Sequence, residues 1–185
     1  METIMRRLLI MLFALCLLPT LAAAAETMPQ VGQMAPGFKL EDQHGHWKSL
    51  DQYRGQWLVL YFYVKDFTPG CTTELRNYRD DYAALRKEGA QVLAISIGSV
   101  KSHAAFAMKY HAPFPMLADT NIKVAKEYGD GVLISRNGMR YAARTTFIIA
   151  PDGHIAKIYT DVNPANNPHQ VLTELPKLKA AYGKA

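Results

Sequence analysis

One cysteine of this chain lies where a helix would activate its thiol. Cys71 follows Thr68, Pro69 and Gly70, and proline is favoured at the first position of a helix because its missing N–H would have no partner there. The pattern predicts Thr68 as the N-cap and Cys71 in the first helical turn. The partial positive charge and free N–H groups of a helix N-terminus favour a thiolate. The segment therefore indicates a nucleophilic cysteine, and Gly70 would let a small substrate approach the backbone closely.

A thiolate in this position has the chemistry needed to attack a hydroperoxide and become a sulfenic acid. Donors that hold the peroxide and stabilise the departing charge would lower the barrier. We expect these donors to be the hydroxyl of Thr68 and the guanidinium of Arg144, which enters an apolar strand and would face Cys71 across the end of a sheet. Each residue also has an ordinary structural interpretation: Thr68 as a helix cap, Arg144 as a surface cation, Cys71 as a buried thiol.

The elements that must position these residues can be read from the apolar pattern. Residues 57–64 form a continuous apolar, β-favouring run of the length of a buried parallel strand. The helix after Pro69 shows an apolar face at spacings of three and four residues, and Gly89 ends it. We therefore expect Cys71 at the junction of a buried strand and an amphipathic helix.

The rest of the chain alternates strands and helices. A hairpin is expected over residues 38–49, strands over 91–97, 114–117, 145–150 and 155–159, and helices over 102–110, 121–128 and 168–181. Residues 129–140 read as an exposed loop or hairpin. This order predicts an α/β domain whose final antiparallel hairpin and helix are typical of a thioredoxin-like fold.

The N-terminal segment reads as a targeting signal. A short basic region (Arg6, Arg7), an apolar run over residues 8–18 and four alanines at 22–25 are typical of a secretory signal peptide. We expect residues 1–25 to be removed, leaving one domain over 26–185 in the periplasm or secreted, with no membrane association after removal. An uncleaved anchor is the alternative, although the run is short for a membrane span.

The cysteine count argues against an internal disulfide, and the charge pattern argues against nucleic-acid binding. The chain has 185 residues, a formal charge of +5 and two cysteines. Cys16 lies in the expected signal peptide, so the exported protein would carry Cys71 alone and form no internal disulfide. Its basic residues are scattered, which is typical of a solvated surface and gives no nucleic-acid footprint.

The whole active-site string resembles that of the peroxiredoxin family. Residues 61–74, YFYVKDFTPGCTTE, are most similar to the bacterioferritin comigratory protein (peroxiredoxin Q) group, in which T-P-G-C-T precedes a helix bearing a glutamate. Further similar segments follow in order at residues 92–96, 114–119, 144–153 and 162–164. The resemblance covers about residues 31–182, nearly all of the chain beyond the expected signal peptide.

This resemblance implies a thioredoxin-like fold with a central mixed sheet flanked by helices, and no cofactor or metal. It implies that Cys71 is the peroxidatic cysteine, that Thr68 and Arg144 position the peroxide, and that Glu74 supports the site. The implied reaction is thiol-dependent reduction of hydrogen peroxide and organic hydroperoxides. The implied partners are an external thiol or a thioredoxin-like reductant, and relatives include monomers and homodimers.

Two residues depart from the family pattern. Val64 stands where many peroxiredoxins have the proline that shields the thiol, and Arg76 stands where many members of this group have a resolving cysteine. The Cys71 sulfenic acid would then be reduced by an external thiol or redox protein, which is a one-cysteine mechanism. Two alternatives stay open: a thiol–disulfide exchange protein, disfavoured because C-x-x-C is absent, and a non-catalytic thioredoxin-fold binding module.

Overall fold

The computed structural model describes residues 27–129 and 133–183. The expected signal peptide, residues 1–25, lies outside the described residues. Within the described ranges, no helix has both the length and the apolar character needed to cross a membrane.

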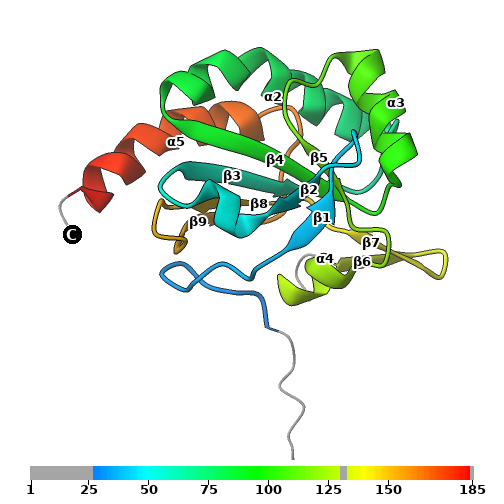
Figure 1. Ribbon diagram of the computed structural model, residues 1–185, viewed down its shortest axis with the longest axis horizontal. Helices are drawn as coiled ribbons and strands as arrows, with labels where there is room; N and C mark the ends of the chain where they lie inside the picture. Colours follow the sequence, from blue (N-terminus) through cyan, green and yellow to red (C-terminus); the bar gives the residue numbers. More distant parts are fainter. Residues whose placement is uncertain (1–26, 130–132, 184–185) are drawn as a thin grey trace, which may run out of the picture.

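A five-stranded mixed sheet forms the centre of the molecule (Figure 1). The strand order is β5-β4-β3-β8-β9. The bounds are β3 (Trp57–Phe62), β4 (Ala90–Ser96), β5 (Met116–Ala118), β8 (Thr145–Ile149) and β9 (Ile155–Tyr159). The first three are mutually parallel, and β8 and β9 complete the sheet with antiparallel pairings. The predicted central mixed sheet is confirmed.

Helices cover both faces of this sheet, with the longer ones on one side. Helices α2 (Pro69–Lys87), α3 (Val100–Tyr110) and α5 (Asn167–Tyr182) lie above the sheet in Figure 1. The short α4 (Lys123–Glu127) lies below it, near the chain leading into the domain. Leu50 of the 3-10 turn η1 (Leu50–Tyr53) joins the same buried cluster as residues of α4. The described chain therefore forms the helix–sheet–helix layering of a thioredoxin-like fold, as predicted.

Strand β3 contributes apolar side chains to two cores, one on each face of the sheet. All six of its residues are buried, and successive side chains point to opposite faces of a sheet. Val59 and Tyr61 join the core under α2, α3 and α5. Leu60 and Phe62 join the second core, which includes residues of α4. The continuous apolar run thus marks a strand covered on both faces.

Two small hairpins lie outside the main sheet. Strands β1 (Lys39–Glu41) and β2 (Trp47–Ser49) form one, and β6 (Leu133–Arg136) and β7 (Met139–Ala142) form the other. Both correspond to segments expected to turn back on themselves. The expected helix over 121–128 is shorter, because Ile122 adopts a left-handed conformation (φ 54°) and the helix begins after it.

The register between β3 and β8 sets the geometry of the site. Phe62 pairs with Thr145 at the last position of the ladder. Val64 lies two residues after the end of β3, and Arg144 immediately precedes β8, so both emerge at the same end of the sheet. Helix α2 begins at that end too, so the fold brings Cys71 and Arg144 to one place.

Candidate active site

Cys71 is buried in the first turn of α2. Thr68 is the N-cap residue and Pro69 occupies the start of the helix, as predicted. Cys71 has an exposed fraction of only 2%. The hydroxyl of Thr68 makes no capping hydrogen bond; it donates to the carbonyl oxygen of Lys65 at 3.1 Å. Thr68 therefore stabilises the loop before the helix, and the free N–H groups of the first turn are left without a side-chain cap.

Arg144 contacts the sulfur of Cys71 directly. Its Nη2 donates to Cys71 Sγ at 3.5 Å, although the two residues are 73 positions apart in the chain. A guanidinium at this distance favours a thiolate and keeps further N–H donors for an oxygen bound beside the sulfur.

Glu74 lies on the other side of Arg144. Its Oε2 is 3.6 Å from Arg144 Nε, and the residue is fully buried. Burial raises the pKa of Glu74 from 4.5 to about 8, and the charge of Arg144 lowers it in part. Neither carboxyl oxygen has a hydrogen-bond partner among the described residues. At neutral pH the carboxyl is therefore mainly protonated, so the positive charge of Arg144 is left to act on the sulfur.

Gly70 is required by the close approach of Arg144. A Cβ added at Gly70 would lie 2.6 Å from Arg144 Nη2 and 3.6 Å from Pro164 Cγ. The sequence suggested that Gly70 leaves room for substrate. In the structure, the guanidinium that contacts Cys71 takes part of that room.

We expect Gly70→Ala to slow oxidation of Cys71 by peroxide about tenfold, because the added methyl displaces Arg144 Nη2. Alanine is a better helix former than glycine, so the unfolding temperature should not fall. Gly37→Ala is the matched control, since a Cβ there meets nothing within 4 Å. Stopped-flow oxidation with hydrogen peroxide measures the effect, and equal rates for the two variants would contradict this role for Gly70.

Hydrogen bonds fix α2 against the far end of the chain. Tyr78 Oη donates to Asn167 Oδ1 at 2.9 Å, and Thr146 Oγ1 donates to the same oxygen at 2.8 Å. Asn77 Nδ2 donates to the carbonyl oxygen of Pro164 at 3.2 Å. Sequence reasoning missed these positioning residues; the only signal was the similarity of residues 162–164 to the family.

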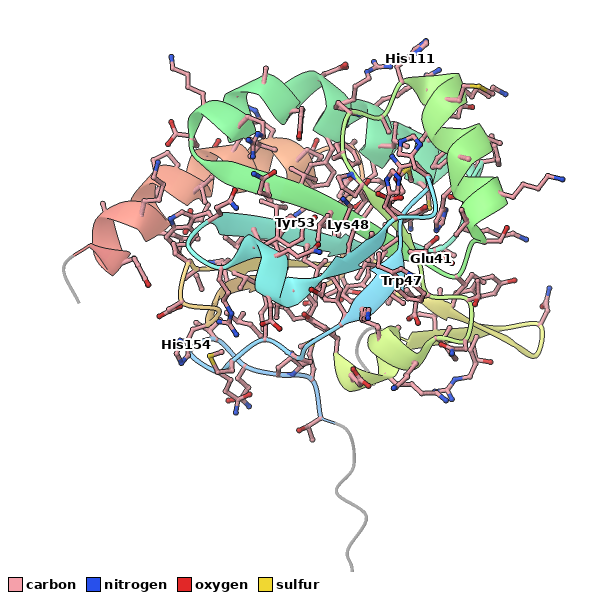
Figure 2. All side chains as sticks on the ribbon, in the orientation of Figure 1. Glu41, Trp47, Lys48, Tyr53, His111 and His154 are labelled. Atoms are coloured by element: carbon pink, nitrogen blue, oxygen red, sulfur yellow. The ribbon has the colours of Figure 1, made fainter. Side chains whose placement is uncertain are left out.

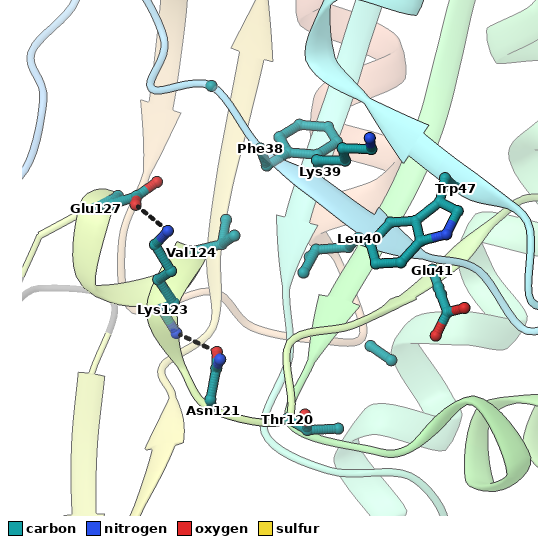
Figure 3. A pocket seen from close by; sticks show the side chains of 12 residues that line it. Phe38, Lys39, Leu40, Glu41, Trp47, Thr120, Asn121, Lys123, Val124 and Glu127 are labelled. Atoms are coloured by element: carbon teal, nitrogen blue, oxygen red, sulfur yellow. Dashed lines mark hydrogen bonds and ion pairs between the residues drawn. The ribbon is translucent and has the colours of Figure 1, made fainter.

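A cavity of about 440 Å³ lies beside Arg144. Its lining is partly apolar. It comes from the loop after β3, the β6–β7 hairpin, the link between β7 and β8, and the turn after β9: Val64, Ile134, Ala143, Arg144, Thr160 and Asp161. A separate cavity of about 600 Å³ lies between the β1–β2 hairpin and α4 (Figure 3). None of the predicted site residues lines that second cavity.

The histidines of the described chain are dispersed. His111 at the end of α3 and His154 between β8 and β9 lie far apart in Figure 2. Among residues 27–129 and 133–183, no group of three or more His, Cys, Asp or Glu side chains is arranged to hold a metal ion. Beside Cys71, the structure places the guanidinium of Arg144 against the thiol.

Comparison with known proteins decides the family. The model of the AhpC/TSA family matches residues 31–158. The chain belongs to the AhpC/TSA family. A putative peroxiredoxin Bcp of Coxiella burnetii is 41% identical over 148 residues, covering 79% of this chain and 98% of the relative. The peroxiredoxin Bcp of Bacillus subtilis is 34% identical, covering 79% and 94%.

Solved structures agree with this assignment. A Xanthomonas campestris bacterioferritin comigratory protein, described in connection with its alkyl peroxide reduction activity, is 31% identical with a TM-score of 0.70, covering 76% of this chain and 90% of that one. This member of the AhpC/TSA family is therefore a peroxiredoxin of the bacterioferritin comigratory protein (peroxiredoxin Q) group, and its activity is that of a thiol peroxidase.

Proposed function

We propose that this peroxiredoxin reduces hydroperoxides by a one-cysteine mechanism at Cys71. The proposal rests on one contact. Arg144 Nη2 donates to the Sγ of Cys71, which lies in the first turn of α2. Beyond residues 1–25 the sequence has no second cysteine, and Arg76 occupies the position five residues after Cys71. Reduction of the oxidised cysteine therefore depends on an external thiol or redox protein.

The residues around the sulfur fit the two half-reactions. The Cys71 thiolate attacks the distal peroxide oxygen, the O–O bond breaks, and the other oxygen leaves as hydroxide or alkoxide and takes a proton. The cysteine becomes a sulfenic acid. Arg144 holds the peroxide and stabilises the departing charge. The Thr68 hydroxyl gives its hydrogen to the carbonyl oxygen of Lys65, so its oxygen is left to accept a hydrogen bond from the peroxide. Glu74 and Gly70 keep Arg144 in place. Two external thiols then return the cysteine to its thiol, releasing water and a disulfide.

The cavity beside Arg144 supports organic hydroperoxides as substrates alongside hydrogen peroxide. Its apolar wall, formed by Val64, Ile134 and Ala143, offers a surface for an alkyl group. The peroxide end would then lie next to the guanidinium that contacts Cys71. The activity described for the Xanthomonas campestris relative is in keeping with this substrate class.

The decisive experiment follows the sulfur itself. Reduced protein is mixed with one equivalent of hydrogen peroxide or cumene hydroperoxide, and intact mass and free thiol are measured over seconds. We expect the thiol to disappear with a mass gain of one oxygen, and Cys71→Ser to show neither change. Added dithiothreitol or reduced thioredoxin should restore the thiol. Oxidation no faster than that of a free small-molecule thiol would overturn the proposal.

We further propose that the protein acts outside the cytoplasm, as a monomer or homodimer. The support is the basic, apolar and alanine-rich order of residues 1–25. The mature chain would be residues 26–185, one domain, and the family match begins at residue 31. Fractionation of cells expressing the full chain, with N-terminal sequencing of the exported form, tests the cleavage after residue 25.

A further inference from the structure

A buried polar cluster lies beside the active-site loop and takes no part in the contacts of Cys71 with Arg144. Asp66 is at its centre, five residues before Cys71. His103 Nδ1 lies 3.0 and 2.9 Å from the two carboxylate oxygens of Asp66. Tyr63 Oη donates to Asp66 Oδ1 at 2.6 Å, and Ser102 Oγ donates to Asp66 Oδ2. The exposed fractions of the His103 and Asp66 side chains are 0% and 1%.

The geometry indicates that His103 is a cation. Its Nε2 lies 3.2 Å from the carbonyl oxygen of Leu117, which only accepts hydrogen bonds. Its Nδ1 faces the carboxylate of Asp66 and, at 3.1 Å, the oxygen of Tyr63, whose single hydrogen is donated to Asp66. Every neighbour of both ring nitrogens is thus an acceptor, so each nitrogen carries a proton. Asp66 and His103 form a fully buried ion pair.

The Asp66–His103 pair connects three parts of the fold to one loop. Tyr63 directly follows β3, His103 belongs to α3, and the carbonyl of Leu117 belongs to β5. The packing is close: a Cβ added at Gly98 would lie 2.5 Å from His103 Cε1 and 2.6 Å from Asp66 Oδ2. A buried ion pair is held by its geometry, and removing one partner leaves the other charge without compensation. Asp66 therefore has one well-defined position.

The loop from Val64 to Thr68 has one internal side-chain hydrogen bond, from Thr68 Oγ1 to the carbonyl oxygen of Lys65. Val64 occupies the position of the family proline, so its φ angle is not restricted by a ring. Phe67 has φ 62°. This left-handed conformation is unfavourable for residues other than glycine, asparagine and aspartate. The ring of Phe67 packs against Phe106 of α3, the helix that also carries His103. Contacts from outside the loop therefore help to hold this strained conformation.

We propose that the Asp66–His103 ion pair is a positioning device for the peroxidase reaction, holding the loop so that α2 begins at Pro69 and Cys71 faces Arg144. Asp66 and His103 touch neither the sulfur nor the peroxide. They act through the loop, and the proposal rests on Cys71 being the peroxide-reactive group.

The test compares four variants: Asp66→Asn, His103→Gln, the double variant, and Ser102→Ala, a milder change that removes one hydrogen bond to Asp66. Two rates are measured on folded protein, Cys71 oxidation by hydrogen peroxide and alkylation by iodoacetamide, together with the unfolding midpoint. Asp42→Asn is the matched control, a buried carboxylate that accepts two backbone N–H bonds in the β1–β2 turn.

We expect each single change to slow peroxide oxidation about tenfold or more, because small displacements of a reacting group have large kinetic effects. Iodoacetamide should react faster, because the loosened loop exposes Cys71. The double variant should recover part of the peroxide rate, because two neutral amides can pair. Ser102→Ala should lower the peroxide rate by a smaller factor. This variant still tests the proposal if Asp66→Asn or His103→Gln does not fold.

Two results would overturn the proposal. One is a peroxide rate in Asp66→Asn and His103→Gln equal to that of Asp42→Asn despite lowered stability, which would make the ion pair purely structural. The other is no recovery in the double variant, which would show that the two residues do not act as a pair. Failure of the proposed function is distinct from both, because the unaltered protein would then react no faster than a small thiol.

Discussion

Arg144→Ala is expected to slow the oxidation of Cys71 by hydroperoxide about a hundredfold or more, the usual effect of losing one preorganised donor to a developing oxyanion. The guanidinium is the one side chain in the described structure that donates a hydrogen bond to Cys71 Sγ. Its removal takes away both the charge that favours the thiolate and the donor for the leaving oxygen. Stopped-flow measurement of the second-order rate constant checks the loss.

Arg144→Lys sharpens this test, because lysine keeps the charge but loses the planar fork of donors. We expect it to recover only part of the rate. Arg140→Ala is the matched control, an exposed arginine of β7 four residues away in the sequence. If Arg144→Ala reacted as fast as Arg140→Ala, the contact with Cys71 would have no kinetic role.

Glu74→Gln is expected to raise stability at alkaline pH. The pKa of Glu74 is raised from 4.5 to about 8 in the folded protein. Between these values the folded state binds the proton and the unfolded state does not, so the free energy of unfolding falls as the pH rises. Glutamine stays neutral at every pH, so the free energy of unfolding of the Glu74→Gln variant does not fall in this way. The difference between variant and unaltered protein should grow from near zero at pH 4.5 to the order of a few kcal/mol at pH 8.

Urea unfolding at a series of pH values measures this difference, with Glu127→Gln, at an exposed carboxylate of α4, as the control. A constant difference across the range would show that the pKa of Glu74 is the same in the folded and unfolded states. The peroxide rate gives a second readout. An ionised Glu74 competes with the thiolate for Arg144, so Glu74→Gln should keep its rate above pH 8 better than the unaltered protein.

The local parts of the site could be predicted from the sequence. Pro69 after Thr68 marks the start of α2, and the apolar run before it marks β3, because both signals depend on neighbouring residues. The order of strands and helices then gives the thioredoxin-like layers. Arg144 was singled out because it enters an apolar strand and was expected to face Cys71 across the end of the sheet.

Contacts between distant segments could not be predicted in the same way. Asp66 and His103 are 37 positions apart, and each read alone is an ordinary loop or helix residue. The burial of Glu74 was also missed: it lies one helical turn after Cys71, but only tertiary packing decides that its face is covered. The hydroxyl of Thr68 was expected to cap the helix and bonds Lys65 instead, because the loop turns back upon itself.

The pairing of β3 with β8 has a consequence for protein engineering. The place of Arg144 is set by a ladder in the middle of the sheet, from Leu58 with Ile149 to Phe62 with Thr145. The β6–β7 hairpin precedes this ladder and lies outside the main sheet. Insertions at its tip, Asn137–Gly138, should leave the ladder unchanged. A library of hairpin tips grafted there would vary the chain next to Ile134, which lines the cavity beside Arg144, while the guanidinium stays at the sulfur.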